Sequence, residues 1–215
     1  MTDSARPLVA VLDYGIGNLR SAQKAFEHAG ADARLTADRS LIADADAVVL
    51  PGVGAFGACM QALRAAGLDE LAHDAADDAV RGGRPFLGIC VGMQMLFEGS
   101  EESPDHRGLG VIPGRLSLLP AGVKRPQMQW NRLDIERPSE LFSTVEDPVW
   151  VYFVHSYAAP ADGEHVVATC DYGGPVAAAI EHGRMWATQF HPEKSGGTGL
   201  QMLQAFVAAA AEYGV

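Results

Sequence analysis

The chain has 215 residues, enough to bury one substantial core, and this length is ordinary for a single α/β domain. It carries 16 Lys and Arg against 27 Asp and Glu, a formal net charge of −11, which argues against a general nucleic-acid binder because phosphate contacts need clustered cations. No run approaches the roughly 18 consecutive apolar residues of a membrane span, and residues 1–7 lack the apolar core of a secretory signal, so we expect a cytoplasmic protein.

The first part of the chain alternates short apolar runs with helical patterns. Such alternation predicts a parallel sheet with helices on both faces, and ligands then gather at the carboxyl ends of the strands. The expected strands are residues 8–12, 33–35, 47–50 and 85–89; the expected helices are residues 19–29, a segment ending at residue 63, residues 71–80 and residues 91–97.

Beyond Gly108 the pattern changes to strands without long helices. These strands are expected at residues 116–119, 133–135, 149–154, 166–169, 176–180 and 185–189, with a closing helix at residues 199–211. No composition break, low-complexity tract or repeat marks a second domain. The sequence therefore predicts one α/β domain over residues 1–215, built on a mixed, mainly parallel sheet flanked by helices.

The segment Gly-Ile-Cys-Val-Gly-Met-Gln at residues 88–94 has the Gly-x-Cys-x-Gly form of a nucleophile elbow, a sharp turn between a strand and a helix. A helix starting at Cys90 would favour the thiolate, which is the form that attacks carbonyl groups. The flanking glycines leave room for a substrate. By itself the pattern also fits a buried cysteine that only packs in the core.

A base for this thiol is offered about a hundred residues later, where His191, Pro192 and Glu193 follow an expected strand. A cysteine nucleophile needs a base to accept its proton and a third group to hold the imidazole in the right tautomer. Pro192 fixes one backbone angle between the two side chains. The sequence therefore predicts a Cys90–His191–Glu193 triad, against the alternative of a surface turn with an incidental histidine.

Together, the Gly-x-Cys-x-Gly elbow and the distant His-x-Glu resemble the class I, triad-type glutamine amidotransferases. Four further motifs narrow the resemblance to the glutaminase subunits of imidazole glycerol phosphate synthase, a family of histidine biosynthesis. They are Leu-Asp-Tyr-Gly-x-Gly-Asn-Leu at residues 12–19, Pro-Gly-Val-Gly-Ala-Phe at 51–56, Tyr-Phe-Val-His-Ser-Tyr at 152–157 and His-Pro-Glu-Lys-Ser at 191–195. The resemblance implies hydrolysis of L-glutamine through a thioester intermediate, on a flavodoxin-like fold that needs no cofactor and no metal.

The segment at residues 51–54 follows the expected strand that precedes the elbow strand, so it can bring backbone N–H groups beside Cys90. That position suits an oxyanion hole, and the resemblance implies that the N–H groups of Val53 and Val91 form it.

Five residues are candidates for binding glutamine. Gln94 lies one turn beyond the nucleophile, and Glu102 matches the acidic residue that the family pairs with the substrate ammonium group. Gly52, Ser156 and Tyr157 resemble the family's cradle for the amino-acid end of glutamine. Glu102 also belongs to an acidic loop, so a solvated charge is the alternative interpretation.

The resemblance also implies a partner, a cyclase subunit of (β/α)8 type that forms a heterodimer with this chain and uses the ammonia. The family's interface positions correspond here to Asn18, Met128, Trp130, Asn131 and Lys194. The sequence departs from the family's Pro-His-Met-Gly-Trp-Asn at residues 126–131, where it has Pro-Gln-Met-Gln-Trp-Asn. The lost glycine reduces the backbone freedom of this segment, which puts the details of docking in doubt.

The sequence also allows other interpretations. The glycine-rich loop at residues 14–18 also fits a simple tight turn, because it lacks the third glycine of a dinucleotide site and the Lys-Ser/Thr pair of a P-loop. The whole chain could serve another synthase, such as an anthranilate or purine enzyme. It could instead be a free-standing γ-glutamyl hydrolase, or a non-catalytic flavodoxin-like binding module.

Overall fold

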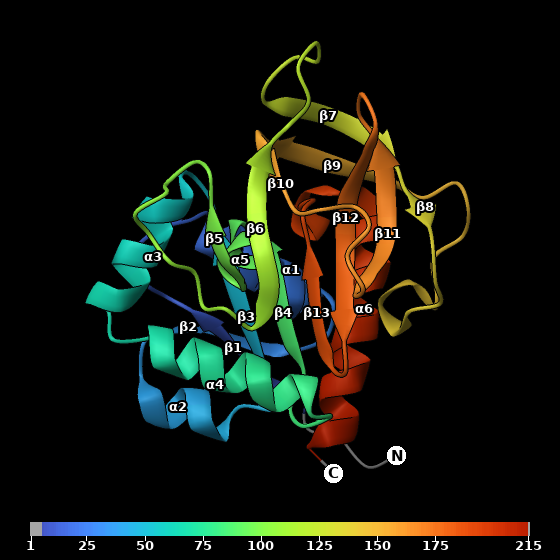
Figure 1. Ribbon diagram of the computed structural model, residues 1–215. Helices are drawn as coiled ribbons and strands as arrows, with labels where there is room; N and C mark the ends of the chain where they lie inside the picture. Colours follow the sequence, from blue (N-terminus) through green and yellow to red (C-terminus); the bar gives the residue numbers. More distant parts are fainter. Residues whose placement is uncertain (1–5, 215) are drawn as a thin grey trace.

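The computed structural model describes residues 6–214, so the expectations for residues 1–5 and 215 lie outside the described part of the chain. Its main feature is an eight-stranded sheet that runs through the centre of the molecule (Figure 1). In spatial order the strands are β2 (Asp32–Thr36), β1 (Leu8–Leu12), β3 (Ala47–Gly52), β4 (Phe86–Cys90), β13 (Met185–Thr188), β12 (Pro175–His182), β11 (Val166–Asp171) and β8 (Asp134–Ile135).

This sheet is mixed in the way that the sequence predicts. The pairs from β2 through β13 are parallel, and the pairs from β13 through β8 are antiparallel. Every residue of β3 and β4 is buried, as expected for central strands covered on both faces. The carboxyl ends of β3, β4 and β13 therefore meet at one edge of the sheet.

Helices cover both faces of the sheet, with α1 and α6 behind it and α4 in front of it in Figure 1. On α1, Leu19, Ala22 and Phe26 form one buried face at helical spacing. The Phe26 ring packs edge-on against Phe206 of α6, and Phe206 packs against Trp186 of β13. The helices are α1 (Leu19–His28), α2 (Arg39–Asp44), α3 (Phe56–Ala65), α4 (Asp69–Val80), α5 (Val91–Met95) and α6 (Gly196–Tyr213).

Two smaller sheets lie beside the carboxyl edge of the large one. A two-stranded antiparallel sheet joins β7 (Gln127–Arg132) to β9 (Trp150–His155), and it forms the top of the molecule in Figure 1. The other contains β10 (Tyr157–Ala158), β6 (Ile112–Leu118) and β5 (Phe97–Ser100). Short 3₁₀ helices occur at Glu140–Phe142 and Pro192–Lys194.

The structure corrects several expected boundaries. The helix expected at residues 91–97 ends at Met95, and Phe97 begins strand β5. Helix α6 begins at Gly196, three residues before the expected start, and α2, β7 and β10 were not expected. Among the described residues, no helix has the length and apolar character needed to cross a membrane.

Candidate active site

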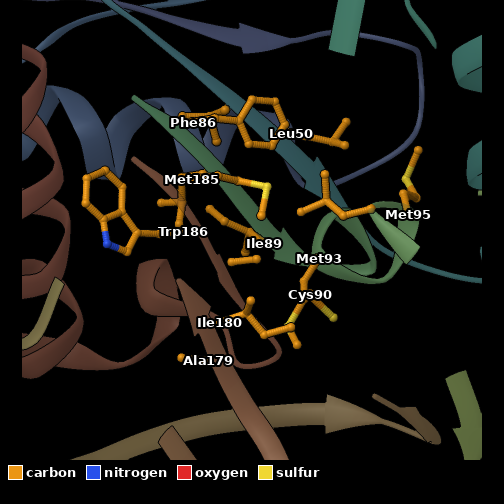
Figure 2. Packing of buried hydrophobic residues seen from close by; sticks show 14 of the residues in the cluster. Leu50, Phe86, Ile89, Cys90, Met93, Met95, Ala179, Ile180, Met185 and Trp186 are labelled. Carbon is orange, nitrogen blue, oxygen red and sulfur yellow. The ribbon is translucent and has the colours of Figure 1, made fainter. Parts of the chain in front are cut away.

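Cys90 lies at the sharp turn where β4 ends and α5 begins, with Ile89 and Met93 close to it (Figure 2). Its φ of 55° falls in the left-handed region, which a non-glycine residue adopts only where the surrounding structure enforces it. A Cβ at Gly92 would collide with the carbonyl oxygen of Leu50, so only glycine allows β3 to approach the elbow this closely. The predicted nucleophile elbow is therefore formed.

The expected contact between His191 and Glu193 is present. His191 Nδ1 lies 2.8 Å from Glu193 Oε1, and both side chains are almost fully buried. The imidazole Nε2 has no hydrogen-bond partner within residues 6–214, and the Cys90 thiol instead points toward the Val154 carbonyl oxygen at 3.9 Å. The structure thus shows no hydrogen bond between Cys90 and His191, and such contacts are often long before substrate binds.

The electrostatics of His191 favour the charged imidazole. Burial lowers its pKa, but the neighbouring Cys90 and Glu193 groups outweigh burial and raise the pKa to about 9. The imidazole is therefore protonated at neutral pH, beside a carboxylate that compensates its charge.

A cleft of about 420 Å³ opens over Cys90 at the carboxyl edge of the sheet. It brings the expected nucleophile and base together with residues from both halves of the chain, and its lining consists of Asn18, Val53, Gly54, Cys90, Val91, Gln94, Glu102, Pro126, Val154, His155, Ser156, Tyr157, His191 and Lys194. A larger cavity of about 930 Å³ lies elsewhere, between β8 and the 3₁₀ helix at Glu140–Phe142. That cavity contains none of the expected site residues.

The expected oxyanion loop follows β3, and Gly52 pairs with Cys90 in the sheet register. Tyr14 Oη donates a 2.5 Å hydrogen bond to the Pro51 carbonyl, and the Cys59 thiol lies 3.2 Å from the Val53 carbonyl. The peptide group between these two carbonyls carries the Val53 N–H, which makes no hydrogen bond to another described residue. The loop is thus held on both sides of the predicted donor.

Two expected glutamine contacts also make bonds inside the protein. The Gln94 amide nitrogen donates to the Tyr157 carbonyl and to Gln189 Oε1, both at 3.0 Å. Glu102 accepts a 2.7 Å hydrogen bond from the N–H of Phe56, at the start of helix α3. Glu102 is therefore anchored beside the cleft. This contact differs from the alternative interpretation, in which Glu102 is a freely solvated charge.

His155 lines the cleft but is held from both sides. Its Nδ1 lies 3.0 Å from the Tyr157 carbonyl, and its Nε2 lies 3.0 Å from the Gln127 side chain. Burial lowers its pKa to about 4, so the ring stays neutral at neutral pH. These contacts and the neutral ring support a structural role for His155.

Three residues near the nucleophile were not expected there. Pro126 and Val154 line the cleft, and Gln189 lies against Cys90. No local pattern indicates these placements, because they depend on how distant strands pair.

The residues expected at the partner interface occupy two places. Asn18 and Lys194 line the cleft, whereas Met128 and Trp130 project from β7 with 60% and 48% of their surface exposed. The Trp130 ring packs against Tyr152 of β9. The Asn131 amide donates to the Asp171 carbonyl, so this side chain supports the β7 strand from within the chain.

The resemblance implies that the protein needs no metal, and the side chains that could bind one are His, Cys, Asp and Glu. In the described part of the chain, no three His, Cys, Asp or Glu side chains lie close enough to hold a metal ion. The three cysteines, Cys59, Cys90 and Cys170, are free and buried.

Comparisons with known proteins agree with this geometry. The model of the family "Glutamine amidotransferase class-I" matches residues 10–210. Imidazole glycerol phosphate synthase subunit HisH of Methanothermobacter thermautotrophicus is 50% identical over 200 residues, which cover 93% of this chain and 98% of that protein. The HisH subunit of Syntrophotalea carbinolica is 48% identical over 209 residues, covering 93% and 98% of the two chains.

The fold is shared more widely. The crystal structure of a putative GMP synthase component from Thermoplasma acidophilum superposes with a TM-score of 0.70 at 18% identity, covering 97% of this chain and 96% of that one. The likeness at this identity concerns the fold alone. On the family match and the HisH relatives together, the chain belongs to the class-I glutamine amidotransferases and, within them, to the HisH subunits of imidazole glycerol phosphate synthase.

Proposed function

We propose that this chain hydrolyses the side-chain amide of L-glutamine at Cys90 and supplies the ammonia to the cyclase subunit of imidazole glycerol phosphate synthase. The observation that carries the proposal is the strained elbow of Cys90 in one cleft with His191, whose partner Glu193 lies directly behind it. The domain spans residues 1–215 and acts in the cytoplasm.

In the first half of the reaction the Cys90 thiolate attacks the amide carbon of glutamine, and the carbonyl electrons move onto oxygen. The N–H groups of Val53 and Val91 stabilise this oxyanion. The His191 imidazolium then donates its proton to the leaving nitrogen, the carbon–nitrogen bond breaks, and ammonia departs from the γ-glutamyl thioester. A raised pKa suits His191 for this step, because the proton is already on the imidazole.

In the second half, neutral His191 removes a proton from water, and the resulting hydroxide attacks the thioester carbon. The carbon–sulfur bond breaks, glutamate leaves, and the thiolate is restored. Glu193 keeps the imidazole oriented and stabilises its positive charge in both halves. Gln94, Glu102, Gly52, Ser156 and Tyr157 form the glutamine pocket in this proposal.

The ammonia needs a sheltered route, because in bulk water at neutral pH it would be protonated and lose its nucleophilicity. A (β/α)8 cyclase seated as a heterodimer over the cleft would provide this route. Asn18 and Lys194 at the cleft, together with exposed Met128 and Trp130, support docking on this side of the molecule.

The experiment that tests the function uses the complex of this chain with its cyclase partner. Glutamine labelled with heavy nitrogen in its side-chain amide is supplied together with an excess of unlabelled ammonium salt, and the isotope content of the imidazole glycerol phosphate is measured. Product that carries mostly the heavy isotope supports hydrolysis and channelling by this chain. Product with the isotope content of the bulk ammonium contradicts channelling, and the absence of heavy ammonium in the solution as well would contradict hydrolysis.

Replacing Glu193 with glutamine is expected to keep the fold and to lower glutaminase turnover about 10²- to 10⁴-fold, because an amide neither stabilises the imidazolium nor enforces its tautomer as a carboxylate does. A thermal melt and a glutaminase assay on the same sample measure the two effects. Glu27→Gln, at an exposed position of α1, is the control. Unchanged turnover would make Glu193 a bystander.

The pH dependence of acylation is expected to follow His191. As the pH rises through about 9, the imidazolium loses its proton, and kcat/KM for glutamine then falls roughly tenfold for each further pH unit. In the Glu193→Gln variant the fall should begin at lower pH, because the carboxylate that holds the proton on His191 is gone. A profile that stays flat well above pH 9 in the parent enzyme would refute the role of His191 as the acid.

A further inference from the structure

We propose that the side-chain amide of Gln189 is a catalytic group of this site: it donates a hydrogen bond to Cys90 Sγ and stabilises the thiolate that attacks glutamine. The inference deepens the proposed function and rests on Cys90 being the nucleophile. Gln189 was not among the residues expected at the site, and the triad mechanism does not use it.

Sheet register brings the two residues together. Strand β13 runs parallel to β4, and Thr188 lies beside Ile89. Gln189 and Cys90 are the next residues along these two strands, so they leave the sheet side by side. The Gln189 backbone N–H donates a 2.8 Å hydrogen bond to the Ala178 carbonyl, which holds the start of this segment against β12. The position of Gln189 relative to the nucleophile is thus set by the core of the fold.

The contact itself is between Gln189 Nε2 and Cys90 Sγ, 3.7 Å apart, a hydrogen-bond distance for sulfur. Gln189 is fully buried and Cys90 is 3% exposed. Bulk water therefore does not compete for the sulfur on this side, and in a buried setting a donor to a charged acceptor has a larger effect than in water.

The orientation of the Gln189 amide is fixed by a backbone carbonyl. Gln189 Oε1 accepts from the Gln94 amide nitrogen at 3.0 Å, and the same nitrogen donates to the Tyr157 carbonyl at 3.0 Å. Turning the Gln189 amide over would place its nitrogen against the nitrogen of Gln94. Turning both amides over would place Gln94 Oε1 against the Tyr157 carbonyl, so that two acceptors faced each other. The N–H of Gln189 is therefore the group that faces the sulfur.

His155 secures the far end of this series of hydrogen bonds. Its Nδ1 also lies 3.0 Å from the Tyr157 carbonyl, and the burial that lowers its pKa to about 4 keeps the ring neutral. The carbonyl thus accepts the N–H of Gln94 and has His155 Nδ1 on its other side. Through Gln94 and Gln189, this fixed oxygen determines which atom faces Cys90.

The Gln189 donor acts differently on the thiol and on the thiolate of Cys90. A thiol sulfur is a weak acceptor, whereas a thiolate is a strong one, so the Gln189 N–H stabilises the charged form more than the neutral form. The N–H groups of Val53 and Val91 are assigned to the substrate oxygen, so Gln189 is a separate donor for the sulfur.

The test is the pH dependence of Cys90 alkylation by iodoacetamide in the complex with the cyclase partner. Alkylation consumes the thiolate but forms no oxyanion and needs no glutamine, so it reports the sulfur alone. In Gln189→Met, which keeps the side-chain length and removes the donor, the midpoint of the alkylation profile should move up by about one pH unit, equivalent to a tenfold loss of thiolate at lower pH. Glutamine hydrolysis should lose kcat with little change in KM.

Gln201→Met, at an exposed position of α6, makes the same chemical change away from the cleft and should leave the profile unchanged. Gln189→Glu is the second variant, because it is isosteric and keeps an acceptor for Gln94; the carboxylate oxygen beside the sulfur should move the midpoint further up. If both variants are folded by thermal melting and show the parent midpoint, the inference is wrong, even where hydrolysis slows.

Failure of the proposed function has a different signature. There, the parent complex would not hydrolyse glutamine, or alkylation of Cys90 would leave hydrolysis intact. The midpoints of the variants would still decide whether Gln189 stabilises the thiolate.

Discussion

Replacing Cys90 with alanine is expected to abolish glutamine-dependent synthesis by the assembled complex, by about 10⁶-fold as for loss of a triad nucleophile, and to leave ammonium-dependent synthesis largely intact. The reason is that in the proposed function the thiol forms the thioester from which ammonia is released, whereas the cyclase site lies on another chain. The buried side chain is small, so alanine leaves only a small cavity.

The measurement is synthase turnover with glutamine, and then with ammonium salt at elevated pH, on the same preparation. Cys170→Ala removes another buried free thiol that does not line the cleft, and it should retain both activities. Glutamine-dependent turnover in Cys90→Ala would show that another group is the nucleophile.

The second large effect is expected from the partner. The isolated chain should be a poor glutaminase, and docking of the cyclase with its nucleotide bound should raise turnover by orders of magnitude. The loop at Val53 provides the structural reason, because Tyr14 and Cys59 hold the carbonyls on either side of the Gly52–Val53 peptide. Rotation of that one peptide would turn the Val53 N–H toward or away from the oxyanion while its neighbours stay in place.

Gain or loss of one oxyanion donor changes the rate enough to act as such a switch. One aligned oxyanion donor contributes about 3 to 4 kcal/mol, or roughly 10²- to 10³-fold in rate. Gly52 and Gly54 flank Val53, and Gly54 already has a φ of 92°, so the loop uses conformations that other residues rarely adopt. The partner's ligand state need only favour one orientation of this peptide for hydrolysis to be coupled to synthesis.

Steady-state glutaminase activity is to be compared in the isolated chain, in the complex, and in the complex with nucleotide. A stepwise rise across the three preparations supports gating. Full activity in the isolated chain would refute it and would favour a free-standing hydrolase.

The sequence is sufficient to predict the parts of the site that depend on local pattern. The glycines around Cys90 predict the elbow, and the order of strands predicts that the loop after β3 lies beside it. Both follow from short-range geometry and from the parallel arrangement that β-α alternation requires. His191 and Glu193 are only two residues apart, so their contact is also a local property.

Other parts of the site depend on long-range packing and were not predictable. Strand β7 has the sequence Gln-Met-Gln-Trp-Asn-Arg, in which the apolar Met128 and Trp130 are exposed and the polar Gln127 is buried, the reverse of the pattern that marks a core strand. The bond from Glu102 to the start of α3 joins residues 46 positions apart. The contact of Gln189 with Cys90 requires the register of β13 on β4, which no local pattern specifies.

The most direct test of the account is covalent labelling by a glutamine analogue with a diazoketone in place of the amide, which alkylates the nucleophile only when bound as substrate. The complex is inactivated with this reagent, digested, and mapped by mass spectrometry. The proposed mechanism predicts one label per chain, on Cys90, with protection by glutamine and with Cys59 and Cys170 unmodified. Complete inactivation with an unlabelled Cys90, or labelling that glutamine does not prevent, would contradict it.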